Sequence, residues 1–169
     1  MTDSNAIIFR LGTLFGISDE FSRIRLDLVV NILVTKALTE GKLTVFGGEQ
    51  WRPLLHVVDV ANAIAQTIES DITGIFNLHY KNFKIIDIAE AIVKKVPSAT
   101  IETTPMKFQD ARNYQVSSEK LYQESGFKAS TNLSKGIEEV YDLISNNRIK
   151  NVHHNRYSNQ NFLEEYGIT

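Results

Sequence analysis

Short apolar runs alternate with segments of helical periodicity along most of the chain, and this alternation restricts the fold more than any other sequence feature. Residues 6–11 and 75–78 are short runs rich in apolar and β-branched residues beside a glycine, which favours buried strands. Residues 42–46 alternate polar and apolar side chains, and residues 53–57 and 100–103 are also predicted to be extended. Because strands and helices follow one another, we predict an α/β fold with parallel pairing where helices connect strands.

Several segments carry apolar residues at the spacing of a helix face. Asp59 is a plausible N-cap, with a carboxylate able to accept from the first helical N–H groups. Glycine or proline follows two of the other segments and predicts their C-terminal ends. The predicted helices are residues 27–40, 59–69, 86–96 and 133–144, with a short helix between Ser117 or Ser118 and Gly126.

The remaining segments are predicted to be irregular. We expect loops at residues 12–19 and 80–84, where no periodicity is evident. Residues 1–146 are predicted to form one domain. The asparagine-rich residues 147–169 are predicted to be a polar tail that docks by its side chains or stays loose.

Composition excludes several classes of function. The chain has 169 residues, of which 43% are hydrophobic and 22% charged, as in an ordinary globular domain. A net charge of −2 gives no general attraction to nucleic acid or an anionic membrane, and no apolar run is long enough to span a bilayer. The absence of cysteine excludes disulfides, thiolate metal sites and cysteine nucleophiles. We therefore expect a cytoplasmic protein without nucleic-acid or membrane partners.

The glycines do not form a dinucleotide-binding loop. Such a loop needs closely spaced glycines between a strand and a helix, so that backbone N–H groups can approach the phosphates. None of the nine glycines stands in a G-x-G-x-x-G arrangement, and no G-x-x-x-x-G-K sequence occurs. The chain as written therefore lacks this cofactor fingerprint.

Two arginines are candidates for binding phosphate. Arg52 and Arg112 lie in predicted loops beside predicted strands, and a guanidinium fork matches phosphate oxygens well. Their spacing alone favours solvated surface arginines over a phosphate site. His56 is interpreted as a buried histidine with satisfied hydrogen bonds. The adjacent His153 and His154 point to opposite sides of an extended chain and suit a metal poorly.

Tyr80 and Lys84 stand four residues apart, as in a tyrosine–lysine pair for proton transfer on one helix face. Here the pair falls in a predicted loop, so the shared-face argument fails. We interpret this spacing as coincidental.

Five stretches resemble a known family when they are taken in order. They are RLGTLFG at 10–16, RLDLVVN at 25–31, LTVFG at 43–47, WRPLLHVVDVA at 51–61 and IFN at 75–77. Together they resemble the C-terminal half of the extended short-chain dehydrogenase/reductase family, and more narrowly its NAD-dependent nucleotide-sugar epimerase/dehydratase group. The resemblance covers about residues 6–146 and implies the last sheet strands plus a small α/β substrate-binding lobe, without the N-terminal Rossmann half.

The resemblance implies a set of residues that bind a nucleotide-diphosphate sugar. The pocket would be lined by Val29, Val30 and Asn31, where a helix begins, and the base and ribose would lie beside Val45 and Phe46. Asn77 would follow a sheet strand, and the diphosphate would be contacted by Arg52 and Arg112. Some relatives carry a lysine near Val29, so that contact differs here.

The same resemblance implies how the chain would function. The family's NAD or NADP loop and its catalytic tyrosine and lysine precede the stretch that matches residues 6–11, so we expect this chain to hold no cofactor or catalytic residue by itself. We therefore expect a substrate-binding portion that needs a Rossmann-half chain or self-association. The alternative is a non-catalytic interaction module or a truncated gene product that works with a partner.

Overall fold

The computed structural model describes residues 6–19, 21–105 and 112–167. The strands in these ranges are β1 (Ile7–Leu11), β2 (Thr13–Phe15), β3 (Lys42–Phe46), β4 (Trp51–His56), β5 (Gly74–Leu78), β6 (Lys81–Lys84) and β7 (Thr100–Thr104). The α-helices are α1 (Val29–Thr39), α2 (Val57–Thr67), α3 (Ile85–Lys95), α4 (Glu119–Ser125), α5 (Leu133–Ser145) and α6 (Asn159–Glu165), and residues Asn155–Tyr157 form a 3-10 turn, η1.

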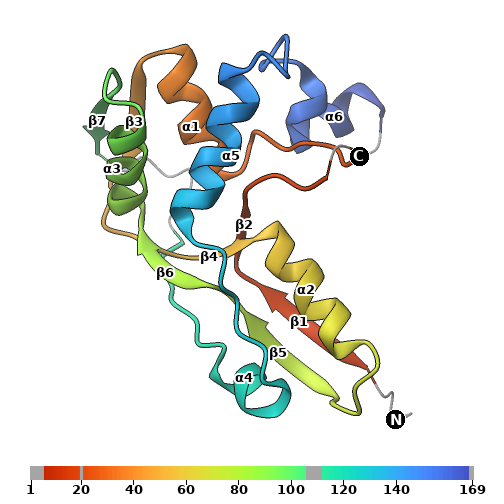
Figure 1. Cartoon of the computed structure of the whole chain (residues 1–169). Coiled ribbons are helices and arrows are strands. Elements are labelled where there is room, and N and C mark those ends of the chain that lie inside the picture. The colour runs from red at the N-terminus through yellow and green to blue at the C-terminus, as the bar shows by residue number, and fades with distance from the viewer. Residues whose placement is uncertain (1–5, 20, 106–111, 168–169) are drawn as a thin grey trace.

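The strands form three small sheets (Figure 1). β1 pairs in parallel with β5, and β3 pairs in parallel with β7. β4 lies between β2, to which it is parallel, and β6, to which it is antiparallel. The predicted α/β class with parallel pairing is therefore confirmed.

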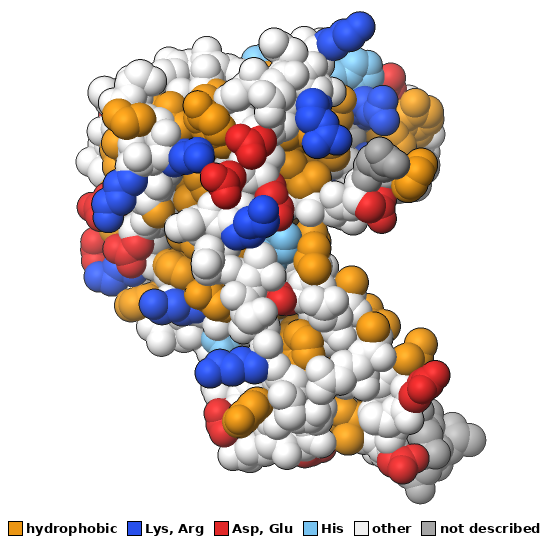
Figure 2. Space-filling model, viewed as in Figure 1, with side chains coloured by type: hydrophobic (Ala, Val, Ile, Leu, Met, Phe, Trp, Pro, Cys, Tyr) orange, Lys and Arg blue, Asp and Glu red, His pale blue; other side chains and the backbone are white. Residues whose placement is uncertain are grey.

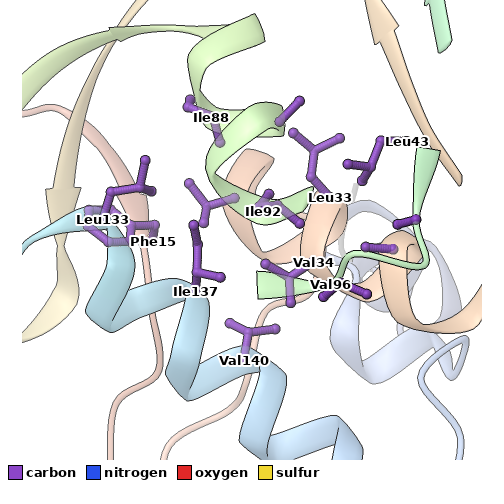
Figure 3. Packing of buried hydrophobic residues seen from close by; sticks show 14 of the residues in the cluster. Phe15, Leu33, Val34, Leu43, Ile88, Ile92, Val96, Leu133, Ile137 and Val140 are labelled. Carbon is purple, nitrogen blue, oxygen red and sulfur yellow. The ribbon is translucent and has the colours of Figure 1, made fainter. Parts of the chain in front are cut away.

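Two hydrophobic clusters fill the two ends of the molecule. In Figure 1, α1, α3 and α5 lie above β4, and β1, β5, α2 and α4 lie below it. Figure 3 shows the larger cluster, in which Ile137 of α5, Ile92 of α3 and Val34 of α1 point toward one another. The smaller cluster includes Phe76 of β5 and Leu121 of α4. Figure 2 shows the surface hollowed on the right between the two ends.

A buried histidine connects the two ends. The His56 ring is fully buried, and its Nδ1 accepts from the Val58 N–H at 3.2 Å, so Nε2 carries the proton. Nε2 donates to the Glu139 carboxylate of α5 at 2.8 Å, and the same carboxylate accepts from the Ile17 N–H at 3.2 Å. The ring also makes an edge contact with Phe15, with centroids 5.1 Å apart. The predicted buried and satisfied His56 is therefore confirmed.

His56 also corrects the predicted start of α2. The helix begins at Val57 with His56 as its N-cap, three residues before Asp59, where we expected the cap. The imidazole Nδ1 accepts from the Val58 N–H in the first turn of the helix. Asp59 lies in the first helical turn instead, where the helix dipole favours its charge. Its carboxylate accepts from the Thr131 N–H at 2.9 Å.

Two expected loops contain strands. β2 lies within residues 12–19, and β6 occupies most of residues 80–84. Each is only three or four residues long, too short to carry a readable period. Their extended conformation is imposed by β4, whose backbone pairs with both of them.

The C-terminal segment docks on the larger cluster. Ile149 is buried in that cluster, and Val152 and Tyr157 pack against it. The Leu26 N–H donates to the Tyr157 carbonyl at 2.9 Å. Of the two alternatives for this segment, a docked tail or a loose one, these contacts favour the docked tail. The segment also contains α6, a short helix that the sequence did not predict.

Gly136 tests how tightly α5 packs on β2. Gly to Ala in a helix normally stabilises by about 1 kcal/mol. Here a Cβ would lie 2.4 Å from a Phe15 ring carbon. We expect Gly136→Ala to destabilise the fold by about 1–3 kcal/mol because the core is overpacked, measured by urea unfolding. Ser134→Ala, at an exposed position of α5, is the control; a stabilised Gly136→Ala variant would contradict the packing.

Candidate functional site

The first turn of α1 carries three of the predicted pocket residues. Val30 is fully buried, and Val29 packs against the larger cluster. The buried Asn31 amide accepts from the Gly16 N–H at 3.1 Å and donates to the carbonyls of Gly16 and Arg25 at 3.0 and 2.8 Å. Asn31 therefore holds the loop that leads into α1.

A charged group anchors the other end of that loop. Arg25 donates to both carboxylate oxygens of Asp27 at 2.9 and 3.0 Å, and the Asn159 N–H donates to the same carboxylate at 2.7 Å. Burial alone would raise the pKa of Asp27, but the hydrogen bonds from Arg25 and Asn159 outweigh it and lower this pKa below its ordinary value. The ionised carboxylate thus joins the loop to the start of α6.

A second element of the candidate site is the extended segment 112–118, which we call the strap. The Trp51 N–H of β4 donates to the Asn113 side chain at 3.0 Å. Asn82 of β6 accepts from the Val116 N–H at 3.1 Å and donates to its carbonyl at 3.0 Å. The strap therefore runs along the central sheet, held by asparagine side chains.

The strap brings the two candidate arginines together. Arg52 lies in β4 and not in the predicted loop, because this part of the chain pairs with β6. It is only 3% exposed, and its Nη1 donates to the Trp51 carbonyl at 2.9 Å and to the Arg112 carbonyl. Arg112 itself is exposed and belongs to no described strand, as expected for a residue in a loop. Asp110 and Ala111, which precede it, lie outside the described residues.

The two predicted base-contacting residues have different surroundings. Val45 is 1% exposed and packs in the larger cluster, whereas Phe46 is 47% exposed at the end of β3. The loop after Phe46 is fixed by Gln50, which donates to the Phe46 carbonyl at 2.7 Å and accepts from the Gly48 N–H at 2.7 Å. Phe46 therefore supplies the exposed aromatic surface of this pair.

Asn77 lies at the other end of the strap. Its side chain donates to the Ser117 carbonyl at 3.3 Å. Nearby, Ser118 Oγ accepts from the His79 N–H at 2.9 Å and lies 2.6 Å from His79 Nδ1, and Asn82 Nδ2 lies 3.4 Å from His79 Nε2. Burial lowers the pKa of His79, which favours a neutral ring.

The structure thus gathers Arg52, Arg112 and Asn77 along the strap, while Asn31 and Val45 act in the packing of α1 and β3. Sequence reasoning missed the two asparagines that hold the strap. Their bonds join residues 34 and 62 positions apart, so no local pattern identifies them.

Two further findings concern residues 6–19, 21–105 and 112–167. No group of three or more His, Asp or Glu side chains in these ranges is placed to hold a metal ion. No helix formed by these residues is both long and apolar enough to cross a membrane.

Comparison with known proteins relates the chain to a family. Residues 1–78 match the model of the NAD dependent epimerase/dehydratase family. UDP-glucuronic acid decarboxylase 1 of Arabidopsis thaliana is 30% identical over 122 residues, which are 70% of this chain and 28% of that protein. The chain is therefore similar to the NAD-dependent epimerase/dehydratase family and to enzymes of nucleotide sugars.

Solved structures share the fold. UDP-glucuronic acid 4-epimerase from Bacillus cereus, in complex with UDP-glucuronic acid and NAD, superposes with a TM-score of 0.69 at 25% identity, covering 83% of this chain and 45% of that one. UDP-glucose 4-epimerase from Thermotoga maritima, with UDP-glucose, superposes with a TM-score of 0.70 at 18% identity, covering 85% and 47%. The chain spans less than half the length of these relatives.

Asp27 predicts a pH dependence of stability. Its lowered pKa means that the carboxylate stabilises the fold above the unfolded-state value, about 3.9, and that this contribution is lost as pH falls through the folded-state pKa. We expect Asp27→Asn to cost about 1–2 kcal/mol at pH 7 and to reduce the stability difference between pH 7 and pH 3.

Urea unfolding at both pH values measures this difference. Asp71→Asn, at an exposed loop position, is the matched control. An Asp27→Asn variant with the parent's stability at both pH values would contradict the role of this carboxylate.

Proposed function

We propose that this chain is the C-terminal, nucleotide-sugar-binding portion of an NAD(P)-dependent epimerase or dehydratase. The observation that carries the proposal is the hydrogen bond from the buried Arg52 guanidinium to the Arg112 carbonyl, which sets two arginines side by side on the central sheet. The family match over residues 1–78 and the shared fold support it.

The arginines have complementary roles in this proposal. Arg52, which is almost fully buried, fixes the backbone of the strap, and the exposed Arg112 presents its guanidinium at the surface. A guanidinium fork binds phosphate through charge-assisted hydrogen bonds, each contributing about 1.5–3 kcal/mol. Phe46 offers an aromatic surface for the base, and Asn77 lies at the far end of the strap.

Hydride transfer requires more than this chain supplies. The sequence lacks a glycine-rich cofactor loop, and the chain covers 45–47% of the epimerase structures it resembles. We therefore propose that NAD or NADP binds to a complementary Rossmann portion. This chain would contribute by holding the diphosphate and positioning the sugar.

Calorimetric titration with UDP-, GDP-, dTDP- and CDP-sugars tests the proposal. We expect one of these ligands to bind, and Arg112→Ala to weaken it about 10- to 100-fold, since a charge-assisted contact is lost. Arg52→Lys, which keeps the charge but loses the fork, should weaken binding by displacing the strap. The same chain with NAD and the bound sugar nucleotide should show no turnover.

Arg148→Ala, at an exposed position outside the site, is the control and should bind as the parent does. Failure of all four ligands to bind, or binding that is unchanged in Arg112→Ala, would contradict a diphosphate site at the strap.

An exposed apolar surface favours a second candidate, an interaction module. On the β1–β5 sheet, the paired residues Ile8 and Ile75 share one face and are 53% and 45% exposed. Within the described residues β1 pairs only with β5, so its outer edge can accept a further strand. We propose that the occupant is a parallel Rossmann-type sheet, since β1 and β5 pair in parallel and the epimerase structure that shares this chain's fold extends beyond the 47% that the chain covers.

Sedimentation velocity tests this surface. When that sheet is absent, we expect the purified chain to self-associate through the same surface. Ile8→Lys should then shift the chain toward monomer because a buried lysine would be unpaired. Lys42→Ala, on the separate β3–β7 sheet, is the control. A parent chain that is monomeric at all concentrations and binds no added Rossmann portion would contradict the interaction module.

A further inference from the structure

The C-terminal segment and the loop before α1 line an open cavity of about 400 Å³. It lies beside α6, where Figure 2 shows blue and pale-blue side chains next to orange ones at the upper right. Its lining has no residue in common with the strap or its partners. This cavity is therefore separate from the proposed diphosphate site.

The polar side chains of the cavity are basic or neutral. Arg23, Arg156 and His154 line it, together with the Ser22 hydroxyl, and its described lining contains no carboxylate. Neither Arg23 nor Arg156 forms an ion pair with a carboxylate of the residues that the structure describes. Two guanidinium groups in one concave site favour an anion, and phosphate best matches their geometry.

Arg23 and His154 are held in place by their neighbours. Arg23 donates to the Asn159 side chain at 2.5 Å and lies over the Phe162 ring, 4.6 Å from its centroid. His154 Nδ1 accepts from the Arg156 N–H at 3.2 Å, so Nε2 is the ring nitrogen left to carry a proton. The side chains are thus partly ordered before a ligand arrives, which reduces the entropy cost of binding.

Aromatic rings form the rest of the lining. Phe162 and Tyr166 pack with ring centroids 4.6 Å apart. Phe21 is 91% exposed, and the Asp19 carboxylate accepts from the N–H groups of Phe21 and Ser22 at 2.9 and 3.0 Å. An exposed phenylalanine whose backbone N–H is held in this way offers a stacking face for a planar ring.

We propose that this cavity binds a nucleoside phosphate, with the phosphate on the guanidinium groups and the base against the aromatic rings. Its volume lies in the range of small-molecule sites. The net charge of −2 gives no extended field for a nucleic-acid strand, so a mononucleotide fits better than a polymer.

Calorimetry with AMP, UMP, adenosine and inorganic phosphate tests this site, with the full chain in an Arg112→Ala background so that the proposed diphosphate site does not contribute. We expect AMP or UMP to bind at least 10-fold more tightly than phosphate or adenosine alone. Arg156→Gln and Phe21→Ser should each weaken the nucleotide about 10-fold. Both positions are exposed, so these variants should keep the parent's circular dichroism spectrum.

Arg148→Gln, in the same segment but outside the cavity, is the matched control and should bind as the parent does. Absence of nucleotide binding, binding unchanged in Phe21→Ser and Arg156→Gln, or binding of a single-stranded RNA 20-mer without AMP or UMP would overturn the proposal. The two sites are distinguished by their variants: Arg112→Ala should weaken binding of the nucleotide sugar at the strap, whereas Phe21→Ser should leave that binding unchanged.

Discussion

The hydrogen bond between His56 and Glu139 connects the two ends of the structure. His56 ends β4 and caps α2, and Glu139 lies on α5 while also accepting from the loop after β2. Because the imidazole is fully buried, loss of either partner would leave a polar group without its hydrogen bond in the interior. This polar contact between β4 and α5 therefore adds to the packing of Phe15 and Leu54 in the larger cluster and helps to position the central sheet, which carries the strap.

The candidate site is built mainly from side-chain to backbone hydrogen bonds. Asn31 fixes the loop before α1, and Asn82 and Asn113 hold the strap against the sheet. An amide can both donate and accept, so one asparagine can replace a missing pair of sheet hydrogen bonds. This explains how an irregular segment can hold Arg112 beside β4 without forming a strand.

The sequence predicted the longer elements because their periodicity reflects burial. The β3 bounds were predicted at residues 42–46, and α5 was predicted to within one residue. The errors arose where tertiary contacts decide the outcome: β2 and β6 are extended because β4 pairs with them, and His56 rather than Asp59 caps α2. The pairing of Arg52 with Arg112 spans 60 positions, so only the family resemblance brought these residues together beforehand.

The hydrogen bonds of the strap also limit how this segment can vary in evolution. Asn113, Val116, Ser117 and Ser118 each bond to a fixed point on β4, β5, β6 or the turn between the last two. An insertion or deletion between them would break several of these bonds at once. The exposed side chains of Tyr114 and Gln115 carry no such restriction. Related chains should therefore conserve the length of the strap while its outward-facing residues diverge.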